Sequence, residues 1–289
     1  MLFASDLDQT LIYSHKTFIS KEIDEQIRPV ESLDDRFISF MTQNALSALK
    51  EIAQRVLFVP VTTRTKLQYQ RINFLDYDIT HQYAVTSNGG TIFSEGVEDK
   101  DWSQLVLEGR DNCLEAQDLI HKFDEISHSS WVIKDSGKLA DDLFYYCLIE
   151  REKIPLTELA AFKLWASENH WELSVQGRKL YLVPLNVNKK AAIHYIQEKE
   201  GMSRVVAAGD SSLDLDMLKV ADLALAPAHG ELYSLYLQRT PGLEKIKFTQ
   251  KNGIEAAEEI LKVVADYEQS IYQKRTCDNI KVYKLCAED

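Results

Sequence analysis

The chain has 289 residues, of which 45% are hydrophobic and 27% are charged, an ordinary composition for a globular protein. Its net charge of -12 argues against a nucleic-acid-binding or membrane-surface protein, because both need a basic face. No apolar run approaches the ~20 residues of a membrane span, and no basic and apolar leader follows Met1. We therefore expect a cytoplasmic monomer or small homo-oligomer whose partner is a small molecule.

Two carboxylates follow the first apolar segment of the chain. Leu2-Phe3-Ala4 has the character of a short buried strand, and Asp6 and Asp8 come directly after it. Residues i and i+2 of an extended backbone point the same way, so both carboxylates project beyond the carboxyl end of the strand. Ligands bind at that edge of open α/β sheets. A solvated acidic turn also fits, so the meaning of the pair depends on later partners.

Residues 13–42 are longer than a simple connection between a strand and a helix needs. Within them, residues 27–40 alternate in part between apolar and polar, with Asp34-Asp35 in the middle as a turn. A β-hairpin flap over the carboxylate pair and a solvent-facing loop explain this pattern equally well.

The next segments fit the first half of a parallel α/β unit. Residues 44–54 have helical spacing, and residues 56–61 form a continuous apolar run that suits a strand buried on both faces. Thr62 follows that strand. Residues 84–87 are another short strand, which ends in the turn signal Asn88-Gly89-Gly90.

The middle of the chain has a different pattern of apolar and polar residues. Its pattern predicts strands and helices in an order typical of an α+β unit with an antiparallel sheet. The predicted strands are 131–134, 143–149, 171–175 and 179–183, and the predicted helices are 112–123 and 156–169.

After residue 185, the alternation of short apolar strands and helices seen at the start of the chain resumes. It predicts helices at 189–199, 213–220 and 254–267, and strands at 204–208 and 223–226. The fold class is therefore α/β, with a parallel-sheet core made from both ends of the chain and the middle inserted as a lid. We assign residues 1–89 and 185–272 to the core, 90–184 to the inserted cap, and 273–289 to a tail or an edge strand.

Polar residues that suit phosphoryl transfer follow the predicted core strands or open a helix. They are Asp6, Asp8, Thr62, Lys189, Asp210 and Asp214. Asp6 would attack phosphorus, and Asp8 would protonate the departing alkoxide and then take a proton from water. Asp6, the main-chain carbonyl of Asp8, and Asp210 would hold Mg²⁺. Lys189 and Thr62 would contact phosphate oxygens, and Asp214 would orient Lys189 or a metal-bound water.

The same residues resemble the four motifs of the haloacid dehalogenase (HAD)-like hydrolases. The resemblance covers about residues 1–230 in order and rests on Asp6-Leu7-Asp8-Gln9-Thr10-Leu11, Val61-Thr62-Thr63-Arg64, Asn188-Lys189-Lys190 and Gly209-Asp210-Ser211-Ser212-Leu213-Asp214. It implies a Rossmann-like core, a mobile cap and Mg²⁺-dependent phosphatase activity. The long insert resembles the type IIB cap subgroup, which includes Cof-like, sucrose-phosphate and mannosyl-phosphoglycerate phosphatases.

The chain departs from this family at two positions. Leu213 stands where relatives usually carry Asn, and Thr63 replaces the usual glycine. Neither change removes a primary catalytic group. Lys190 is the alternative to Lys189 if the third motif is shifted by one residue.

Substrate contacts are predicted on both sides of the site. In relatives, the turn at Asn88 and Gly89 and residues of the cap line the pocket. Arg64 either approaches the phosphate or pairs with a nearby carboxylate. The cap candidates for a second anionic group are Arg178, Lys179, Lys134, Lys138 and His128, although each also fits a solvated surface residue.

The leading hypothesis is a metal-dependent phosphatase that acts on a small phosphorylated metabolite, such as a sugar phosphate. A phosphomutase or phosphotransferase would use the same covalent chemistry and pass the phosphoryl group to a hydroxyl of the substrate. A non-catalytic binding protein is the third reading, and Leu213 is the residue that favours it.

Overall fold

The computed structural model describes residues 1–17 and 26–285, with residues 274–285 described by their backbone alone. Its central layer is a five-stranded parallel sheet in the order β15-β14-β13-β1-β5. The strands are β1 (Leu2–Ser5), β5 (Leu57–Pro60), β13 (Val205–Ala208), β14 (Leu223–Ala226) and β15 (Ile246–Phe248). Both ends of the chain contribute strands, as predicted.

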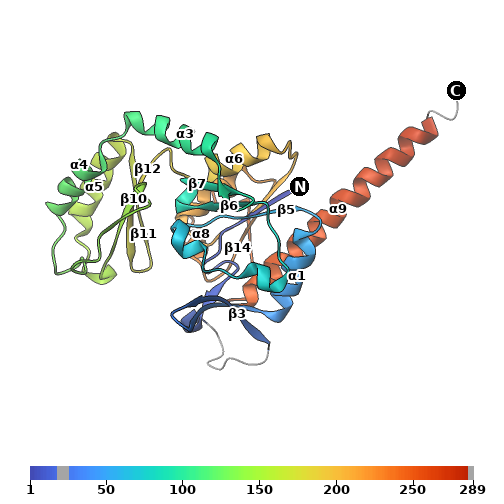
Figure 1. Ribbon diagram of the computed structural model, residues 1–289, viewed down its shortest axis with the longest axis horizontal. Helices are drawn as coiled ribbons and strands as arrows, with labels where there is room; N and C mark the ends of the chain where they lie inside the picture. Colours follow the sequence, from blue (N-terminus) through green and yellow to red (C-terminus); the bar gives the residue numbers. More distant parts are fainter. Residues whose placement is uncertain (18–25, 286–289) are drawn as a thin grey trace.

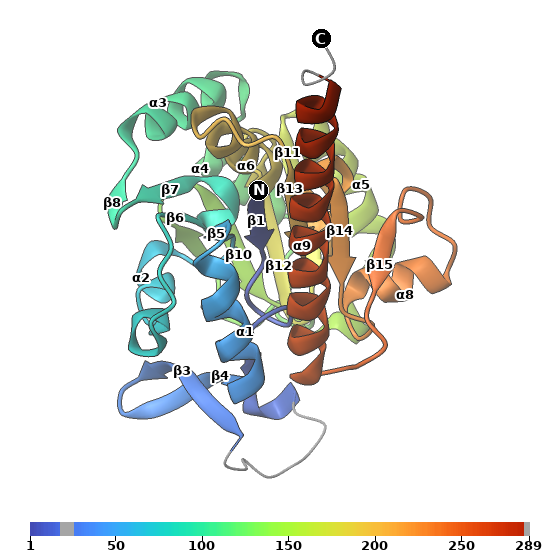
Figure 2. The same ribbon diagram turned by 90° about the vertical axis from the view of Figure 1, so that its right-hand side faces the viewer.

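Helices cover both faces of this sheet (Figures 1 and 2). Successive residues of β1 are fully buried and belong to opposite clusters, with Leu2 and Ala4 on one face and Phe3 on the other. The Phe3 face packs against α1 (Gln43–Ala53) and α9 (Glu255–Leu285). The opposite face packs against α6 (Lys189–Lys199) and α7 (Leu215–Val220).

The inserted unit contains a four-stranded antiparallel sheet in the order β11-β12-β10-β9. Its strands are β9 (Lys138–Ala140), β10 (Phe144–Leu148), β11 (Trp171–Gln176) and β12 (Lys179–Pro184). Helices α4 (Ala116–Asp124) and α5 (Leu156–Glu168) cover one face through a separate apolar cluster. The fold-class prediction, a parallel core with an inserted α+β unit, is confirmed, while the proposed limits of the cap at residues 90 and 184 stay a prediction.

Short elements connect the core to the inserted unit. These are α2 (Lys66–Tyr69), β6 (Tyr83–Thr86), β7 (Thr91–Ser94), β8 (Val97–Glu98) and α3 (Lys100–Gly109). Strands β6, β7 and β8 form a small antiparallel sheet, and β6 adjoins the main sheet through a parallel bridge between Val61 and Val85. Helix α8 (Glu231–Leu237) follows β14.

The hairpin predicted within residues 27–40 is present. Strands β3 (Ile27–Leu33) and β4 (Arg36–Thr42) are antiparallel, and β2 (Tyr13–Ser14) pairs with β4. Asp34 and Asp35 form the tip with φ of 47° and 59°, the positive values that a tight two-residue hairpin turn requires. We call β3 and β4 the flap hairpin.

Three local predictions differ from the structure. The segment 131–134 is a turn with a single bridge between Val132 and Ile149, because Trp131 is buried under α4 instead of alternating along a strand. The first cap helix begins at Ala116 instead of Asn112. Residues 273–285 continue α9 and form no edge strand, whereas residues 286–289 lie outside the described residues and the assignment of 273–289 to a tail stays a prediction.

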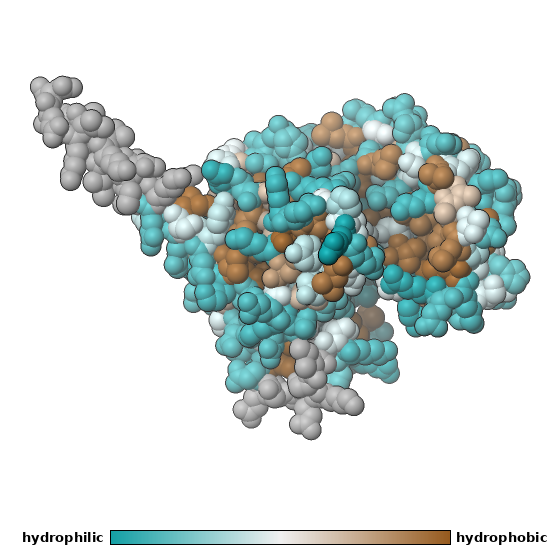
Figure 3. Space-filling model, turned by 180° about the vertical axis from the view of Figure 1, so that it is seen from behind, coloured by the Kyte–Doolittle hydropathy of each residue, from teal (hydrophilic) through white to brown (hydrophobic). Residues whose placement is uncertain are grey.

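Hydrophilic residues cover most of the surface shown in Figure 3, with apolar residues in smaller groups. Among the described residues, the search for membrane-spanning helices found none of sufficient length and hydrophobicity.

Candidate active site

Asp6 and Asp8 lie where the chain leaves β1. The backbone N–H of Asp6 donates to the Ala208 carbonyl at 2.9 Å, so Asp6 continues the pairing of β1 with β13. The chain then turns, because the N–H groups of Leu11 and Ile12 both donate to the Leu7 carbonyl. Both carboxylates line one cavity, as the spacing predicts, but Asp6 is buried while the Asp8 side chain is 48% exposed.

Lys189 joins Asp6 to Asp214. Its Nζ donates to Asp6 Oδ1 and to Asp214 Oδ1, each at 2.6 Å, and all three side chains are buried. Burial alone would lower the pKa of Lys189, but the two carboxylates raise it above its ordinary value. Lys190 is exposed, so the structure places Lys189 and not its neighbour at the site. We call Asp6, Lys189 and Asp214 the lysine relay.

Helix α6 begins at Lys189 because Asn188 caps it. The Asn188 side chain accepts a hydrogen bond from the Ala191 N–H at 2.8 Å, which satisfies one free donor of the first turn. The lysine therefore extends from a fixed helix end.

Asp214 is fully engaged within the protein. Its Oδ2 accepts hydrogen bonds from the N–H groups of Asp210 and Ser211 and from the Ser211 hydroxyl, at 3.2, 3.0 and 2.8 Å. Gly209 leaves the room for this, since a Cβ there would lie 2.4 Å from the Asp214 Cβ. Asp214 therefore contacts both Lys189 and the loop that carries Asp210, while its predicted role, to orient Lys189 or a metal-bound water, stays a prediction.

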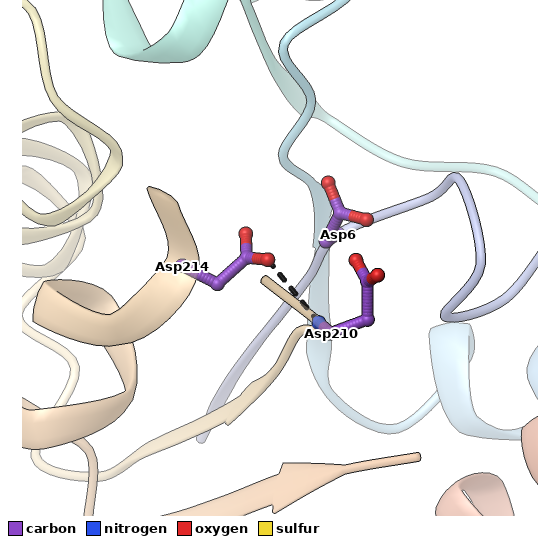
Figure 4. Close-up of side chains that lie close together, drawn as sticks. All are labelled: Asp6, Asp210 and Asp214. Carbon is purple, nitrogen blue, oxygen red and sulfur yellow. Dashed lines mark hydrogen bonds between the residues drawn. The ribbon is translucent and has the colours of Figure 1, made fainter. Parts of the chain in front are cut away.

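Asp210 faces Asp6 across the end of the sheet (Figure 4). Carboxylate oxygens of Asp6, Asp210 and Asp214 lie within 4.8 Å of one another. No described residue donates a hydrogen bond to the Asp210 carboxylate, in contrast to that of Asp214. Burial, followed by the charges of Asp6 and Asp214, raises the pKa of Asp210 well above its ordinary value.

The pKa of Asp6 is also raised, to about 7, first by burial and despite the opposing charge of Lys189. Three carboxylates thus share one cation. A divalent metal would relieve this imbalance, and oxygen ligands of this kind fit Mg²⁺. Because Asp214 is already satisfied, Asp6 and Asp210 are the side chains that fit as ligands.

Arg64 makes a second set of ion pairs. Its Nε and Nη2 donate to the two carboxylate oxygens of Asp8 at 2.7 and 2.8 Å, and its Nη1 pairs with Glu31 Oε1 at 2.8 Å. Enclosure by the protein would raise the pKa of Asp8, but the guanidinium of Arg64 lowers it below its ordinary value. Glu31 lies on β3 and is 3% exposed. We call Asp8, Arg64 and Glu31 the arginine relay.

Thr62 is fully buried and is not among the residues that line the cavity. Its Oγ1 accepts a hydrogen bond from the Arg64 N–H at 3.1 Å, so in this structure it fixes the turn after β5. Thr63, where relatives have glycine, does line the cavity. The predicted contact between Thr62 and phosphate stays a prediction.

Asn88 and Gly89 are also buried and lie outside the cavity lining. The Asn88 side chain donates to the Val187 carbonyl at 3.2 Å. Gly89 has a φ of 99°, and a Cβ there would lie 2.3 Å from the Asn188 carbonyl oxygen. Both residues therefore support the chain just before Lys189, while their predicted contact with substrate stays a prediction.

The cavity lies between the core and the cap sheet and has a volume of about 820 Å³. The cap contributes apolar and aromatic side chains together with Arg151, Arg178 and Lys179. Of the five cap candidates from the sequence, Arg178 and Lys179 line this cavity, and Lys134, Lys138 and His128 do not. Burial lowers the pKa of Lys179, opposed by the charge of Asp8.

The cap contacts the core at the loop that carries Asp210 and at the chain near Lys66 and Ser87. Gln176 Nε2 of β11 donates to the Ser211 hydroxyl at 3.0 Å, beside Asp210. Asp141, between β9 and β10, accepts hydrogen bonds from the Ser87 hydroxyl and, at 3.0 Å, from the Lys66 N–H. The cap position in this structure is therefore held by polar contacts at two separate points.

His229 also reaches the cavity. Its Nδ1 accepts a hydrogen bond from the Gly253 N–H at 3.1 Å, so its Nε2 carries the proton and donates to the Gln9 carbonyl at 3.0 Å. His229 thus supports the turn after Asp8, and the geometry gives it no catalytic task.

Glu31 and Ser39 are the site residues that sequence reasoning missed. The Ser39 hydroxyl donates to Glu31 Oε2 at 2.5 Å, and both side chains are buried. Regular alternation would place Glu31 on the outer face, opposite to Val30, so the sequence pattern contains no signal for it.

The comparisons with known proteins agree with this geometry. Residues 1–267 match the family model described as sucrose-6F-phosphate phosphohydrolase. The chain belongs to this family. It is therefore a phosphatase of the HAD-like hydrolases, as the four motifs predicted. The search of the curated proteins found no match.

Solved structures show the same fold at low identity. The sucrose-phosphatase from Synechocystis sp. PCC6803, in complex with sucrose and phosphate, has a TM-score of 0.67 at 15% identity and covers 93% of this chain and 98% of its own. A Thermoplasma acidophilum protein has a TM-score of 0.58 at 13% identity, covering 91% and 97%. A HAD/COF-like hydrolase from Plasmodium vivax has a TM-score of 0.58 at 14% identity, covering 92% and 95%.

Proposed function

We propose that this phosphatase hydrolyses the phosphomonoester of a sugar phosphate, with Mg²⁺ as cofactor and an aspartyl phosphate on Asp6 as intermediate. The observation that carries the proposal is the lysine relay. It presents a buried carboxylate to a cavity beside Asp210, whose carboxylate has no donor among the described residues.

In the first half of the reaction, an oxygen of Asp6 forms a bond to phosphorus while the bond to the sugar oxygen breaks. The departing oxygen takes a proton from Asp8. The pair with Arg64 favours the ionised form of Asp8, so Asp8 carries this proton on one carboxyl oxygen while its other oxygen keeps its hydrogen bond from Arg64.

In the second half, water attacks the phosphorus of the aspartyl phosphate and the bond to Asp6 breaks. The ionised form of Asp8, which the structure favours, accepts the proton of this water. Lys189 stays close to the reacting carboxylate throughout and offsets negative charge there. When bound at Asp6 and Asp210, Mg²⁺ would supply positive charge to the phosphate oxygens.

The cavity supports a sugar as the leaving group. Its volume of about 820 Å³ falls within the roughly 300–1,000 Å³ of small-molecule sites. Phe144, Tyr146 and Tyr181 line it with ring centroids 6.1 to 6.4 Å apart. The family description and the solved complex with sucrose and phosphate favour a sugar as the group that bears the phosphate.

The test is phosphate release from sucrose 6F-phosphate, hexose phosphates and nucleoside monophosphates, with Mg²⁺ and with a chelator. We expect release from a sugar phosphate that needs the metal and is lost in Asp6→Asn. Asp216→Asn, an exposed carboxylate on α7, is the matched control and should keep its activity. Release that persists in Asp6→Asn would contradict the assignment of the nucleophile.

A further inference from the structure

The flap hairpin reaches Arg64, the partner of Asp8, through two buried side chains, Glu31 of β3 and Ser39 of β4, and Glu31 carries the charge. The Glu31 carboxylate contacts two nitrogens of Arg64. Nη1 lies 2.8 Å from Oε1, and Nη2 donates to Oε2 at 3.0 Å. The same guanidinium holds both oxygens of Asp8. Arg64 is thus fixed at two ends, by the flap and by Asp8.

A β-bulge turns Glu31 toward Arg64. The register of β3 against β4 shifts on both sides of Glu31, between Pro29 and Glu31 and between Glu31 and Ser32. Adjacent residues of a regular strand point to opposite faces, yet Val30 and Glu31 are both buried. Val30 packs into the apolar cluster of the core, and the irregular register leaves Glu31 inside as well, against Arg64.

We propose that Glu31 is a positioning residue of the reaction, which holds the Asp8 carboxylate in place for proton transfer by fixing Arg64. This rests on the proposed function, in which Asp8 exchanges protons with the leaving group and with water. Glu31 touches neither, so it acts through Arg64 alone.

The lysine relay shows the same design in the core. There a carboxylate outside the reaction, Asp214, fixes the cation that pairs with Asp6. A long side chain held at one end retains several rotamers, whereas one held at both ends has a single direction. Loss of Glu31 would release Arg64 and let Asp8, whose side chain is 48% exposed, leave the position in which it meets the leaving oxygen.

A merely structural role for Glu31 makes a different prediction. If Glu31 only neutralised Arg64, its loss would lower the activity on all substrates alike. If Glu31 acts through Asp8, its loss should lower the activity mainly on substrates whose leaving group needs a proton. Departure of a sugar alkoxide needs a proton, while departure of p-nitrophenolate hardly does, and kcat/KM reports the first half of the reaction.

The experiment compares kcat/KM for the best sugar phosphate and for p-nitrophenyl phosphate in the full-length protein with Mg²⁺. In Glu31→Gln we expect a fall of roughly tenfold to a hundredfold on the sugar phosphate, and less than about threefold on the aryl phosphate. Asp35→Asn, which removes an exposed carboxylate at the tip of the same hairpin, should change neither. Ser39→Ala, which removes a hydroxyl that donates to Glu31 and accepts from Arg64, should show a weaker form of the same selectivity.

The double variant Asp8→Asn/Glu31→Gln tests whether Glu31 acts through Asp8. We expect no further loss on the sugar phosphate beyond that of Asp8→Asn alone. Equal losses on both substrates, or additive losses in the double variant, would overturn the proposal.

Failure of the proposed function would look different, because the wild-type protein would then release phosphate from neither substrate. In that case the same four proteins (wild type, two single variants and the double) are compared by urea denaturation. If the double variant loses less free energy of unfolding than the sum of the two single variants, the link from Glu31 to Asp8 is supported. If the losses add, the link is refuted.

Discussion

The lysine and arginine relays have the same plan and different surroundings. In each, one cation bridges a carboxylate that we propose to be catalytic, Asp6 or Asp8, and a second carboxylate that takes no part in the proposed reaction. The lysine relay is built from the core alone, and its three side chains are buried. The arginine relay depends on the flap hairpin, and its catalytic member is half exposed.

This difference sets opposite pKa directions for the two catalytic carboxyls. Burial raises the pKa of Asp6 to about 7, because Lys189 must also offset Asp214 and Asp210 lies close by. The pKa of Asp8 is lowered, because the guanidinium of Arg64 outweighs its enclosure. One carboxylate is thus short of positive charge and suits a metal, and the other is already balanced and suits proton exchange.

Removal of Lys189 should have the largest effect. Lys189→Met leaves Asp6 and Asp214 buried without a cation, so we expect the free energy of unfolding to fall by about 3–5 kcal/mol and activity to be lost. Chemical denaturation measures the first and phosphate release the second. Lys190→Met removes the exposed neighbouring lysine and should change little. Equal stability of the two variants would contradict the lysine relay.

Removal of Arg64 should destabilise the protein less. Arg64→Met leaves Glu31 buried and unpaired, but the exposed Asp8 can be hydrated, so we expect a loss of roughly 1–3 kcal/mol in the free energy of unfolding. Arg71→Met is the matched control, because Arg71 lines the same cavity and makes no ion pair with the described residues. A loss as large as that of Lys189→Met would show that the relays do not differ as described.

Mg²⁺ binding at Asp6 and Asp210 should stabilise the folded protein by an amount that depends on pH. The raised pKa values of Asp6 and Asp210 mean that the folded chain holds protons more tightly than the unfolded chain. Without metal, the stability that these two carboxyls contribute is therefore fully present below about pH 4 and is lost as the pH rises through about 7.

Mg²⁺ at roughly ten times its dissociation constant should restore about 1.4 kcal/mol at pH 8, and less at pH 5, where protons compete. Denaturation at both pH values with Mg²⁺ or chelator measures this. Asp210→Asn should abolish the response to Mg²⁺, and an undiminished response in that variant would remove Asp210 from the metal site.

The smallest effect is expected at the tip of the flap hairpin. Asp34 and Asp35 both have positive φ, which Asn-Gly adopts more readily. We expect Asp34→Asn/Asp35→Gly to change the free energy of unfolding by no more than about 0.5 kcal/mol and to leave kcat/KM unchanged. A change in the ratio of activities on sugar and aryl phosphates would show that the tip, as well as Glu31, governs Asp8.

The sequence predicts the lysine relay better than the arginine relay. Asp6, Lys189, Asp210 and Asp214 each follow a core strand or open a core helix, and strand order alone brings such positions to one edge of a parallel sheet. The partner of Arg64 could not be found this way. Glu31 is buried because a bulge interrupts the alternation of β3, and strand periodicity carries no sign of that bulge.

Other differences also arise from packing. Asn88 and Gly89 are buried against residues 187–189, a contact between segments about a hundred residues apart that no local pattern reveals. The segment at 131–134 has strand-like residues but supplies Trp131 to the apolar cluster of the cap. Helix α9 continues beyond Tyr267, the last of its residues that the described apolar cluster contains, so the helical period of residues 254–267 does not mark its end.

The flap hairpin has a consequence for how this enzyme can diverge. Its tip is exposed and its two strands pair outside the five-stranded sheet, so changes of length or sequence there leave the sheet intact. Yet Glu31 and Ser39 of this hairpin both reach Arg64. If the proposed roles of Glu31 and Asp6 hold, a lineage can alter which leaving groups are accepted by remodelling a peripheral hairpin, while Asp6 and Asp210 are inherited unchanged.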